Sequence, residues 1–277
     1  MAKSLRKQKT DVLRGTPLNP NVSDVVRYQK KLDVLINRMA SDVEAQLKKL
    51  FKTSTAKEYF AADDSISGQA KILTNMLTEK WEDIFAKWSK PIAESVAEEA
   101  DKSSAVAMRS SIQAFTDNIT IKATSLSAEM KDILSATTTE NVALIKSIST
   151  KYLNGVQQAV MRSITTGRGL ADLVPYLENT KQITKRRARM IANDQTRKAF
   201  NAMNRGRMNK LGVAKFEWLH SGGSQHPRRD HIELSGKIFS IDDPPVIDKA
   251  TGQRGYPGDL INCRCRYVPV ITLNEEE

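Results

Sequence analysis

The fold of the C-terminal part is decided by Asn262-Cys263-Arg264-Cys265 and by the earlier segment His226-Pro227-Arg228-Arg229-Asp230-His231. Both cysteines of the protein lie in the first segment, and two of its three histidines lie in the second. The other motifs around them are Trp218-Leu219-His220, Gly236-Lys237-Ile238-Phe239, Asp243-Pro244-Pro245 and Gly255-Tyr256-Pro257-Gly258. Cysteine and histidine are side chains that bind soft metal ions. Their concentration in a Gly/Pro-rich stretch indicates a small module that is stabilised by one common element.

Three strands are expected in this module. Residues 213–220 alternate so that Phe216 and Trp218 share one face, residues 236–241 follow a turn, and residues 265–271 are rich in β-branched side chains. Residues 242–260 contain so many prolines and glycines that we expect a long ordered loop there. The sequence therefore predicts a small α+β module over residues 213–277, ending in an acidic tail.

A structural zinc ion is one candidate for what holds the module together. On a strand, Cys263 and Cys265 would point to the same face, so two thiolates could reach one ion. His231, with His226 or Asp230, would complete a tetrahedral Cys₂His₂ or Cys₂His-Asp site. No partner for an activated water is evident nearby, so such an ion would be structural.

The alternative is a packed core without metal. Cys-x-Cys is tighter than the usual spacing of zinc ligands, and free cysteine is common in small cores. His231 could equally be a buried, hydrogen-bonded histidine beside Trp218. Both interpretations stay open at this point.

The order W…R-x-x-H…G-x-x-F…P-P…P-G…N-C-R-C resembles the C-terminal domain of the phage Mu F-like minor head proteins, the head-morphogenesis family of tailed phages. The resemblance covers roughly residues 140 to 272 and is specific in its last third. In that family, the positions of His231, Cys263 and Cys265 belong to the motif, whereas the position of His226 more often carries another residue.

The resemblance implies a minor capsid protein and no enzyme. Such a protein is present in few copies and associates with the portal inside the procapsid. Its partners would be the portal, other capsid proteins and the packaged double-stranded DNA. Its location would be the interior of the phage head in the virion, after synthesis in the host cytoplasm.

The rest of the chain predicts a mainly α fold. Residues 1–22 are basic and then Pro/Asn-rich, which indicates a flexible arm. Residues 23–135 carry apolar side chains at three- and four-residue steps and predict an elongated helical domain. Within it, one helical run should end near Pro91 and a third helix should cover residues 92–115, before a short extended segment at 118–124.

Residues 136–212 predict a further helical segment. A capping box, Thr137-x-x-Glu140, should open a helix that Thr166-Gly167-Arg168-Gly169 ends. A short helix should follow, interrupted or bent around Pro175. A basic helix should then run from Thr184 to Leu211 and stop at Gly212.

The basic helix is the candidate contact with DNA. Residues 181–212 contain ten Lys or Arg and one acidic residue, Asp194. Such a run is often only a solvated face, but it also suits nonspecific contact with DNA phosphates or an acidic partner. No aromatic residues alternate with the charges, so readout of base sequence is not supported. The candidate DNA-binding residues are Arg186, Arg187, Arg189, Arg197, Lys198, Arg205 and Arg207.

Composition narrows the class of function. The formal charge of +11 favours an anionic partner. No apolar run is long enough for a membrane span, and the basic N-terminus lacks the apolar region of a secretory signal. Aromatic residues make up 6% of the chain, which suits packed helices with little room for a small-molecule substrate.

Two other functions are compatible with parts of the sequence. The first is a nonspecific DNA-binding protein ejected with the genome. The second is a metal-dependent, HNH-like nuclease, suggested by Asp230-His231, Asn262 and the paired cysteines. The nuclease pattern departs after Cys265, where no His or Asn follows at helix spacing and residues 267–271 predict a strand.

Overall fold

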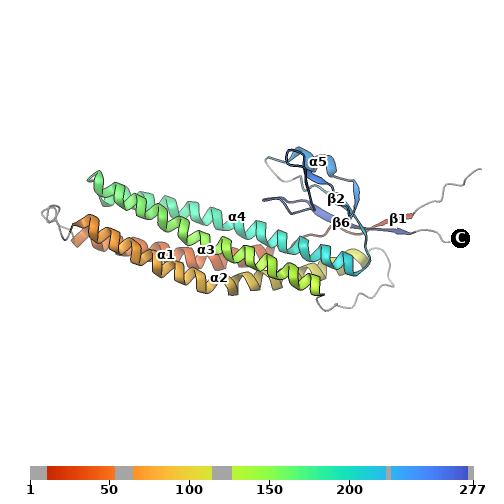
Figure 1. The fold of residues 1–277 in the computed structure, drawn as a ribbon, viewed down its shortest axis with the longest axis horizontal. Coiled ribbons are helices and arrows are strands. Elements are labelled where there is room, and N and C mark those ends of the chain that lie inside the picture. The colour runs from red at the N-terminus through yellow and green to blue at the C-terminus, as the bar shows by residue number, and fades with distance from the viewer. Residues whose placement is uncertain (1–10, 54–64, 114–126, 223–225, 274–277) are drawn as a thin grey trace, which may run out of the picture. The chain divides into compact units, whose positions relative to one another are not determined.

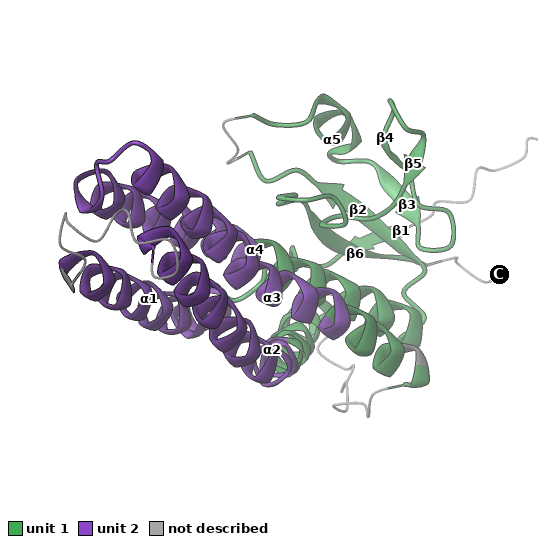
Figure 2. Ribbon diagram, turned by 60° about the vertical axis from the view of Figure 1, so that its left-hand side comes forward, with its two compact units in different colours: residues 1–22, 97–137, 194–277 green, residues 23–96, 138–193 purple. Residues whose placement is uncertain are grey.

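The computed structural model describes residues 11–53, 65–113, 127–222 and 226–273. They form two compact units: unit 1 contains residues 1–22, 97–137 and 194–277, and unit 2 contains residues 23–96 and 138–193 (Figure 2). The boundaries of these units cut through the long helices, so the units do not coincide with the expected linear division into 23–135, 136–212 and 213–277.

The predicted mainly α fold is confirmed. The four long helices of the described residues are α1 (Val22–Thr53), α2 (Ile66–Gln113), α3 (Ala128–Thr165) and α4 (Leu170–Lys210), and all four are labelled in Figure 1. A short helix, α5 (Arg229–Leu234), lies among the strands of the C-terminal residues.

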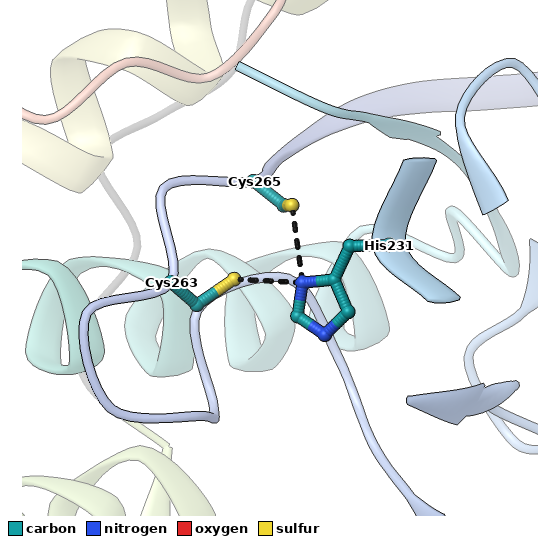
Figure 3. Close-up of side chains that lie close together, drawn as sticks. All are labelled: His231, Cys263 and Cys265. Atoms are coloured by element: carbon teal, nitrogen blue, oxygen red, sulfur yellow. Dashed lines mark hydrogen bonds between the residues drawn. The ribbon is translucent and has the colours of Figure 1, made fainter. Parts of the chain in front are cut away.

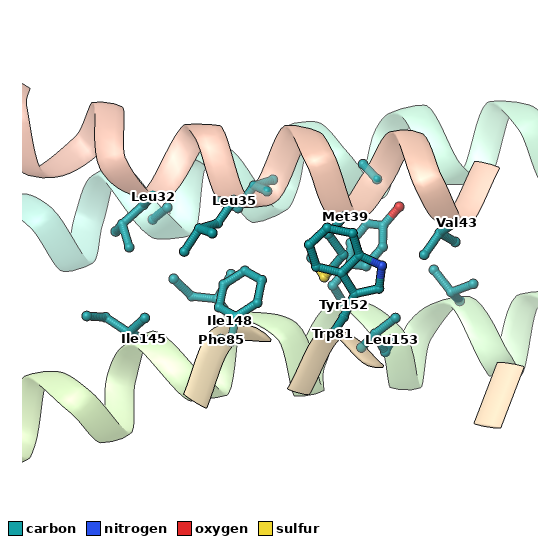
Figure 4. Close-up of a cluster of buried hydrophobic side chains, with 14 of the residues drawn as sticks. Leu32, Leu35, Met39, Val43, Trp81, Phe85, Ile145, Ile148, Tyr152 and Leu153 are labelled. Carbon is teal, nitrogen blue, oxygen red and sulfur yellow. The ribbon is translucent and has the colours of Figure 1, made fainter. Parts of the chain in front are cut away.

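Unit 2 is a bundle of helix segments around a continuous apolar core. Figure 4 shows part of that core, in which Leu32 and Met39 of α1 and Phe85 of α2 are fully buried. Tyr152 of α3 joins them and is also buried. The apolar residues whose three- and four-residue spacing predicts the helices therefore form the helix faces that pack together.

The predicted helix end near Pro91 is wrong, and so is the separate short helix around Pro175. Pro91 lies inside α2 and Pro175 lies inside α4. A proline removes one backbone hydrogen bond from a helix, but tertiary packing on both sides can outweigh that loss. In α2 the buried residues Phe85 and Ile92 flank Pro91 within one core, which keeps the helix continuous.

The start of α3 also differs from the prediction. The helix begins at Ala128, where the Ser127 hydroxyl accepts a hydrogen bond from the Met130 amide at 3.2 Å, so the box at Thr137 lies inside the helix. Its end at Thr165 is confirmed. The stop at Gly212 is confirmed too, since α4 ends at Lys210 and Gly212 adopts a φ of +70°. The expected extended segment 118–124 lies outside the described residues.

Unit 1 contains a four-stranded antiparallel sheet in the order β1-β6-β2-β3. The three predicted strands are confirmed as β2 (Lys215–Leu219), β3 (Ile238–Ser240) and β6 (Arg266–Leu273). Phe216 and Trp218 point into the core of this unit, as the alternation predicts. Tyr267 of β6 packs edge-on against Phe216, with ring centroids 5.1 Å apart.

The predicted flexible arm is wrong from residue 11 onward. Residues Asp11–Arg14 form β1, which pairs antiparallel with β6. The amide of Leu18 donates to the Tyr267 carbonyl at 2.9 Å, and the Leu18 side chain is fully buried. The composition of this segment carries no sign of its partner strand, which lies at the other end of the chain.

The predicted loop 242–260 is not wholly irregular. It contains a small hairpin of β4 (Val246–Asp248) and β5 (Gln253–Arg254), with an irregular register. Gly252 takes a φ of +71° in the connection, a conformation that residues with a Cβ rarely adopt. The side chain of Ile247 is fully buried and ties the hairpin to the core.

Candidate metal centre and basic helix

His231, Cys263 and Cys265 converge in unit 1, as Figure 3 shows. The Nδ1 atom of His231 lies 3.5 Å from the Sγ atom of each cysteine. All three side chains are buried, and their candidate ligand atoms lie within 4.8 Å of one another. The convergence expected from the sequence is therefore present.

His231 is positioned by α5 and by the sheet. Its ring packs edge-on against the indole of Trp218 on β2, with centroids 5.2 Å apart. After the helix, Gly236 turns the chain at a φ of +80°, and its amide donates to the Trp218 carbonyl at 2.8 Å. The helix and the strand are thereby tied together beside the cluster.

The two cysteines reach the cluster from a turn and not from a strand, so the predicted geometry of a shared strand face is wrong. They precede β6, and Asn262 before them has a φ of 59°. The amide of Cys263 donates to the Leu260 carbonyl at 2.9 Å, and the amide of Asn262 donates to the Asp194 carboxylate at 2.7 Å. This tight turn brings both sulfur atoms to one point.

The two thiols differ in acidity. The pKa of Cys263 falls to about 4, because hydrogen bonds from Cys265, from His231 and from the Gly258 amide outweigh the opposing effect of burial. The pKa of Cys265 is raised, because its proton is held in the hydrogen bond to Cys263 and because it is buried. The pair thus favours one thiolate that shares a proton with its neighbour, and a thiolate is the form that binds metals.

The other predicted ligands do not join this group. His226 is exposed and is not part of it. Asp230 accepts a hydrogen bond from the Lys249 amide at 3.0 Å, and its second oxygen lies 3.8 Å from the Lys249 ammonium.

A histidine that the prediction missed lies beside the cluster. The Nδ1 atom of His220 is 3.6 Å from Cys265 Sγ. Strand alternation alone does not identify it, because its position depends on the register that places the residue after β2 across from the residue before β6.

In unit 2, the predicted DNA-binding residues of α4 divide into two kinds. Arg186 and Arg189 are exposed. Arg187 instead donates to the carbonyl and the hydroxyl of Ser147, at 3.1 and 2.9 Å, and burial lowers its pKa. Arg187 therefore holds α4 against α3 within this unit.

In unit 1, the remaining four cations are engaged inside the protein. Arg207 is almost fully buried and pairs with Asp101 at 2.6 Å. Arg205 lies over the ring of Tyr256, 4.5 Å from its centroid. Lys198 pairs with Asp194 at 3.5 Å, and Arg197 is partly buried with a pKa lowered first by burial and then by Arg264. The seven predicted cations thus do not share one exposed face.

None of the helices in the described ranges is both long and apolar enough to cross a membrane.

Comparisons with known proteins give one family and two relatives. Residues 154–268 match the family model described as Phage Mu protein F like protein. A protein of Haemophilus influenzae, described as uncharacterized, is 27% identical over 275 residues, which are 98% of this chain and 59% of that protein. The uncharacterized protein YqbB of Bacillus subtilis is 27% identical over 125 residues, which are 42% of this chain and 41% of YqbB. The chain thus covers less than two thirds of the length of either relative, and no solved structure matches it.

The matched segment includes all of α4, the strands β2 and β3, and all three residues of the cluster. The matched range lies within residues 140 to 272, the stretch over which the sequence motifs resemble this family. Residues 154–268 are therefore similar to the Phage Mu protein F like family, in agreement with the resemblance of the closing motif.

Proposed function

We propose that this chain is a minor head protein of a tailed phage that associates with the portal inside the procapsid and contacts the packaged DNA. The observation that carries the proposal is the family match over residues 154–268, which contains the motif with His231, Cys263 and Cys265. A structural role also agrees with the site, because the buried cluster leaves little room for a substrate.

A groove in unit 2 supports docking on another protein. It lies between α1 and α2, has a volume of about 470 Å³, and is lined by apolar side chains that include Val34 and Trp88. Trp88 is 54% exposed. Lys31 and Arg38 also line the groove, so it suits a partner surface with an apolar centre and acidic neighbours.

Recovery with the portal tests this proposal. The chain should co-purify with the portal from assembling procapsids, and Trp88→Ser should weaken that association. Val106→Ser is the matched control, because Val106 is a 64% exposed residue of the same helix outside the groove. A wild-type chain that is absent from procapsids, or present without any link to the portal, contradicts the proposal.

Contact with DNA is proposed for the exposed cations Arg186 and Arg189. Phosphate contacts give binding that is independent of sequence and falls with salt. Replacing both residues with glutamine should weaken binding to duplex DNA and reduce the salt slope by about one unit per lost contact. Arg168→Gln is the control, since Arg168 is exposed but lies outside the basic helix. Equal affinity at low and high salt contradicts the proposal.

We also propose that the cluster holds a structural zinc ion through His231, Cys263 and Cys265. In a tetrahedral site with Zn–S bonds of about 2.3 Å and Zn–N bonds of about 2.0 Å, sulfur and nitrogen ligands lie about 3.5 Å apart. The two S···N distances of 3.5 Å match this separation. Elemental analysis of protein purified without added metal tests the proposal, and zinc well below one ion per chain contradicts it.

A further inference from the structure

We infer that His220 is the fourth ligand of this zinc site, which makes it a closed Cys₂His₂ centre. The inference rests on the proposed binding of zinc by His231, Cys263 and Cys265. It replaces the exposed His226 with a histidine that lies against the cluster.

The first support is a distance. His220 Nδ1 lies 3.6 Å from Cys265 Sγ, and His231 Nδ1 lies 3.5 Å from the same atom. Both values match the separation of about 3.5 Å between sulfur and nitrogen ligands of a tetrahedral zinc ion. Cys265 therefore has an imidazole nitrogen at ligand spacing on each of two histidines. His220 lies outside the group whose ligand atoms are all within 4.8 Å of one another, so binding of zinc requires its ring to move toward Cys263 and His231.

The second support is the way in which the backbone fixes His220. The last residue of β2, Leu219, pairs with Arg266, so His220 and Cys265 follow as neighbours across the same ladder. The amide of His220 donates to the Ser235 hydroxyl at 3.1 Å. Ser235 is the C-cap of α5, the helix that carries His231. Both histidines are thus held by elements that are bonded to each other next to the cysteines.

The third support is that the nearby carboxylates have other roles. Asp230 is engaged by Lys249. Asp259 accepts a hydrogen bond from the Tyr256 amide at 2.9 Å, and burial raises its pKa, so its charged form is disfavoured. Zn²⁺ with two thiolates and two neutral imidazoles has no net charge, which favours such a set in a buried site.

The chain offers its own matched control for this inference. Purified full-length protein would be compared as wild type, His220→Ala, His226→Ala and Asp259→Asn, and zinc affinity would be measured by competition with a chromophoric chelator. We expect His220→Ala to lower the affinity about 100-fold or more, because losing even an outer-shell partner of a metal ligand costs 10- to 100-fold. His226→Ala and Asp259→Asn should stay close to wild type.

Cobalt provides a readout of the ligand set itself. Co²⁺ in place of Zn²⁺ should give the intense visible bands of a tetrahedral site and the near-ultraviolet band of thiolate coordination. His220→Ala should change the visible bands and keep the thiolate band, because both cysteines remain. His220→Cys supplies a replacement ligand and should restore tight binding, which separates loss of a ligand from failure to fold.

The outcomes distinguish this inference from the proposed zinc site. Wild-type protein without bound zinc or cobalt overturns the site as a whole. Wild-type protein that binds zinc while His220→Ala binds it equally well overturns the assignment of His220 alone. A loss confined to His226→Ala or Asp259→Asn assigns the fourth position to that residue instead.

Discussion

The two units are stabilised in different ways. Unit 2 buries a long series of aliphatic and aromatic side chains from several helices, so its stability is distributed over many similar contacts. The C-terminal residues of unit 1 also have an apolar core, but they form only short strands and a two-stranded hairpin, and Cys263 and Cys265 of the candidate metal site lie within that core. A core built from many similar contacts tolerates the loss of any one of them. A module that depends on one cluster of side chains should lose stability when a member of that cluster is removed.

Removal of zinc should give the largest difference between the two units. Because ligand binding is part of the folding free energy of a structural zinc site, chelation should loosen residues 226–265 and leave the helices of unit 2 folded. Hydrogen exchange resolved by peptide measures both regions in one sample. Unchanged protection of residues 242–260 after complete removal of metal would leave only the packed-core interpretation. In that case Cys263→Ser should cost about 1–3 kcal/mol.

Truncation of a core side chain in unit 2 should destabilise the protein nearly as much as removal of zinc does. In this case the loss comes from packing alone. Phe85 is fully buried, so Phe85→Ala should lower the free energy of unfolding by about 3–5 kcal/mol, independently of zinc. Trp88 lies one turn away in the same helix and is 54% exposed, so Trp88→Ala should lower the free energy of unfolding clearly less than Phe85→Ala does. Denaturant unfolding followed by circular dichroism measures both. Similar losses for the two variants would contradict the burial that separates them.

Arg207 tests how much a buried ion pair contributes to the stability of unit 1. Arg207→Met leaves the Asp101 carboxylate without its partner, and the expected loss is about 2–3 kcal/mol, since that carboxylate keeps some access to water. The double variant Arg207→Met/Asp101→Leu should recover part of this loss in thermal unfolding. Arg207→Met should leave the salt slope of DNA binding unchanged. If the folded variant shows a reduced salt slope of DNA binding, Arg207 contacts DNA, contrary to this expectation.

Local signals predicted the elements of the fold, and contacts between distant residues explain where the prediction failed. Apolar spacing identified α1, and alternation identified the buried face of β2, because both patterns are created by neighbours in the sequence. The pairing of β1 with β6 joins the two ends of the described chain, so no local pattern could reveal it. The helix end expected at Pro91 is wrong because the cost of a proline is local, whereas the packing that offsets it involves residues distant in the sequence.

The same distinction applies to the candidate site. The residue types and their motif were sufficient to select His231, Cys263 and Cys265. The sequence could not separate His220 from His226, because that choice depends on the register of β2 against β6 and on the turn after α5. It also could not show that Arg207 and Arg187 are engaged inside the protein, since a run of charge does not identify which members are buried.

The smallest expected effect concerns a polar contact at the edge of the unit 2 core. Asp42 accepts hydrogen bonds from the Lys80 ammonium at 2.7 Å and from the Trp81 indole at 2.8 Å. Burial alone would raise the pKa of Asp42, but these bonds outweigh it and hold the pKa below its ordinary value of 3.8. A depressed pKa in the folded state stabilises the protein above the ordinary value, and this stabilisation is lost as the pH falls through the folded value.

Asp42→Asn should therefore lower the free energy of unfolding at neutral pH by less than about 1 kcal/mol, because part of this pair is open to solvent. The difference from wild type should shrink as the pH falls below about 4, where the wild-type carboxylate also becomes neutral. Asp83→Asn is the control: Asp83 is an exposed residue of α2 that pairs with Lys87, so its removal should cost even less. Urea unfolding between pH 3 and pH 7 measures all three proteins. A difference between Asp42→Asn and wild type that stays constant over this range would show that the loss comes from packing around Trp81 and not from the carboxylate charge.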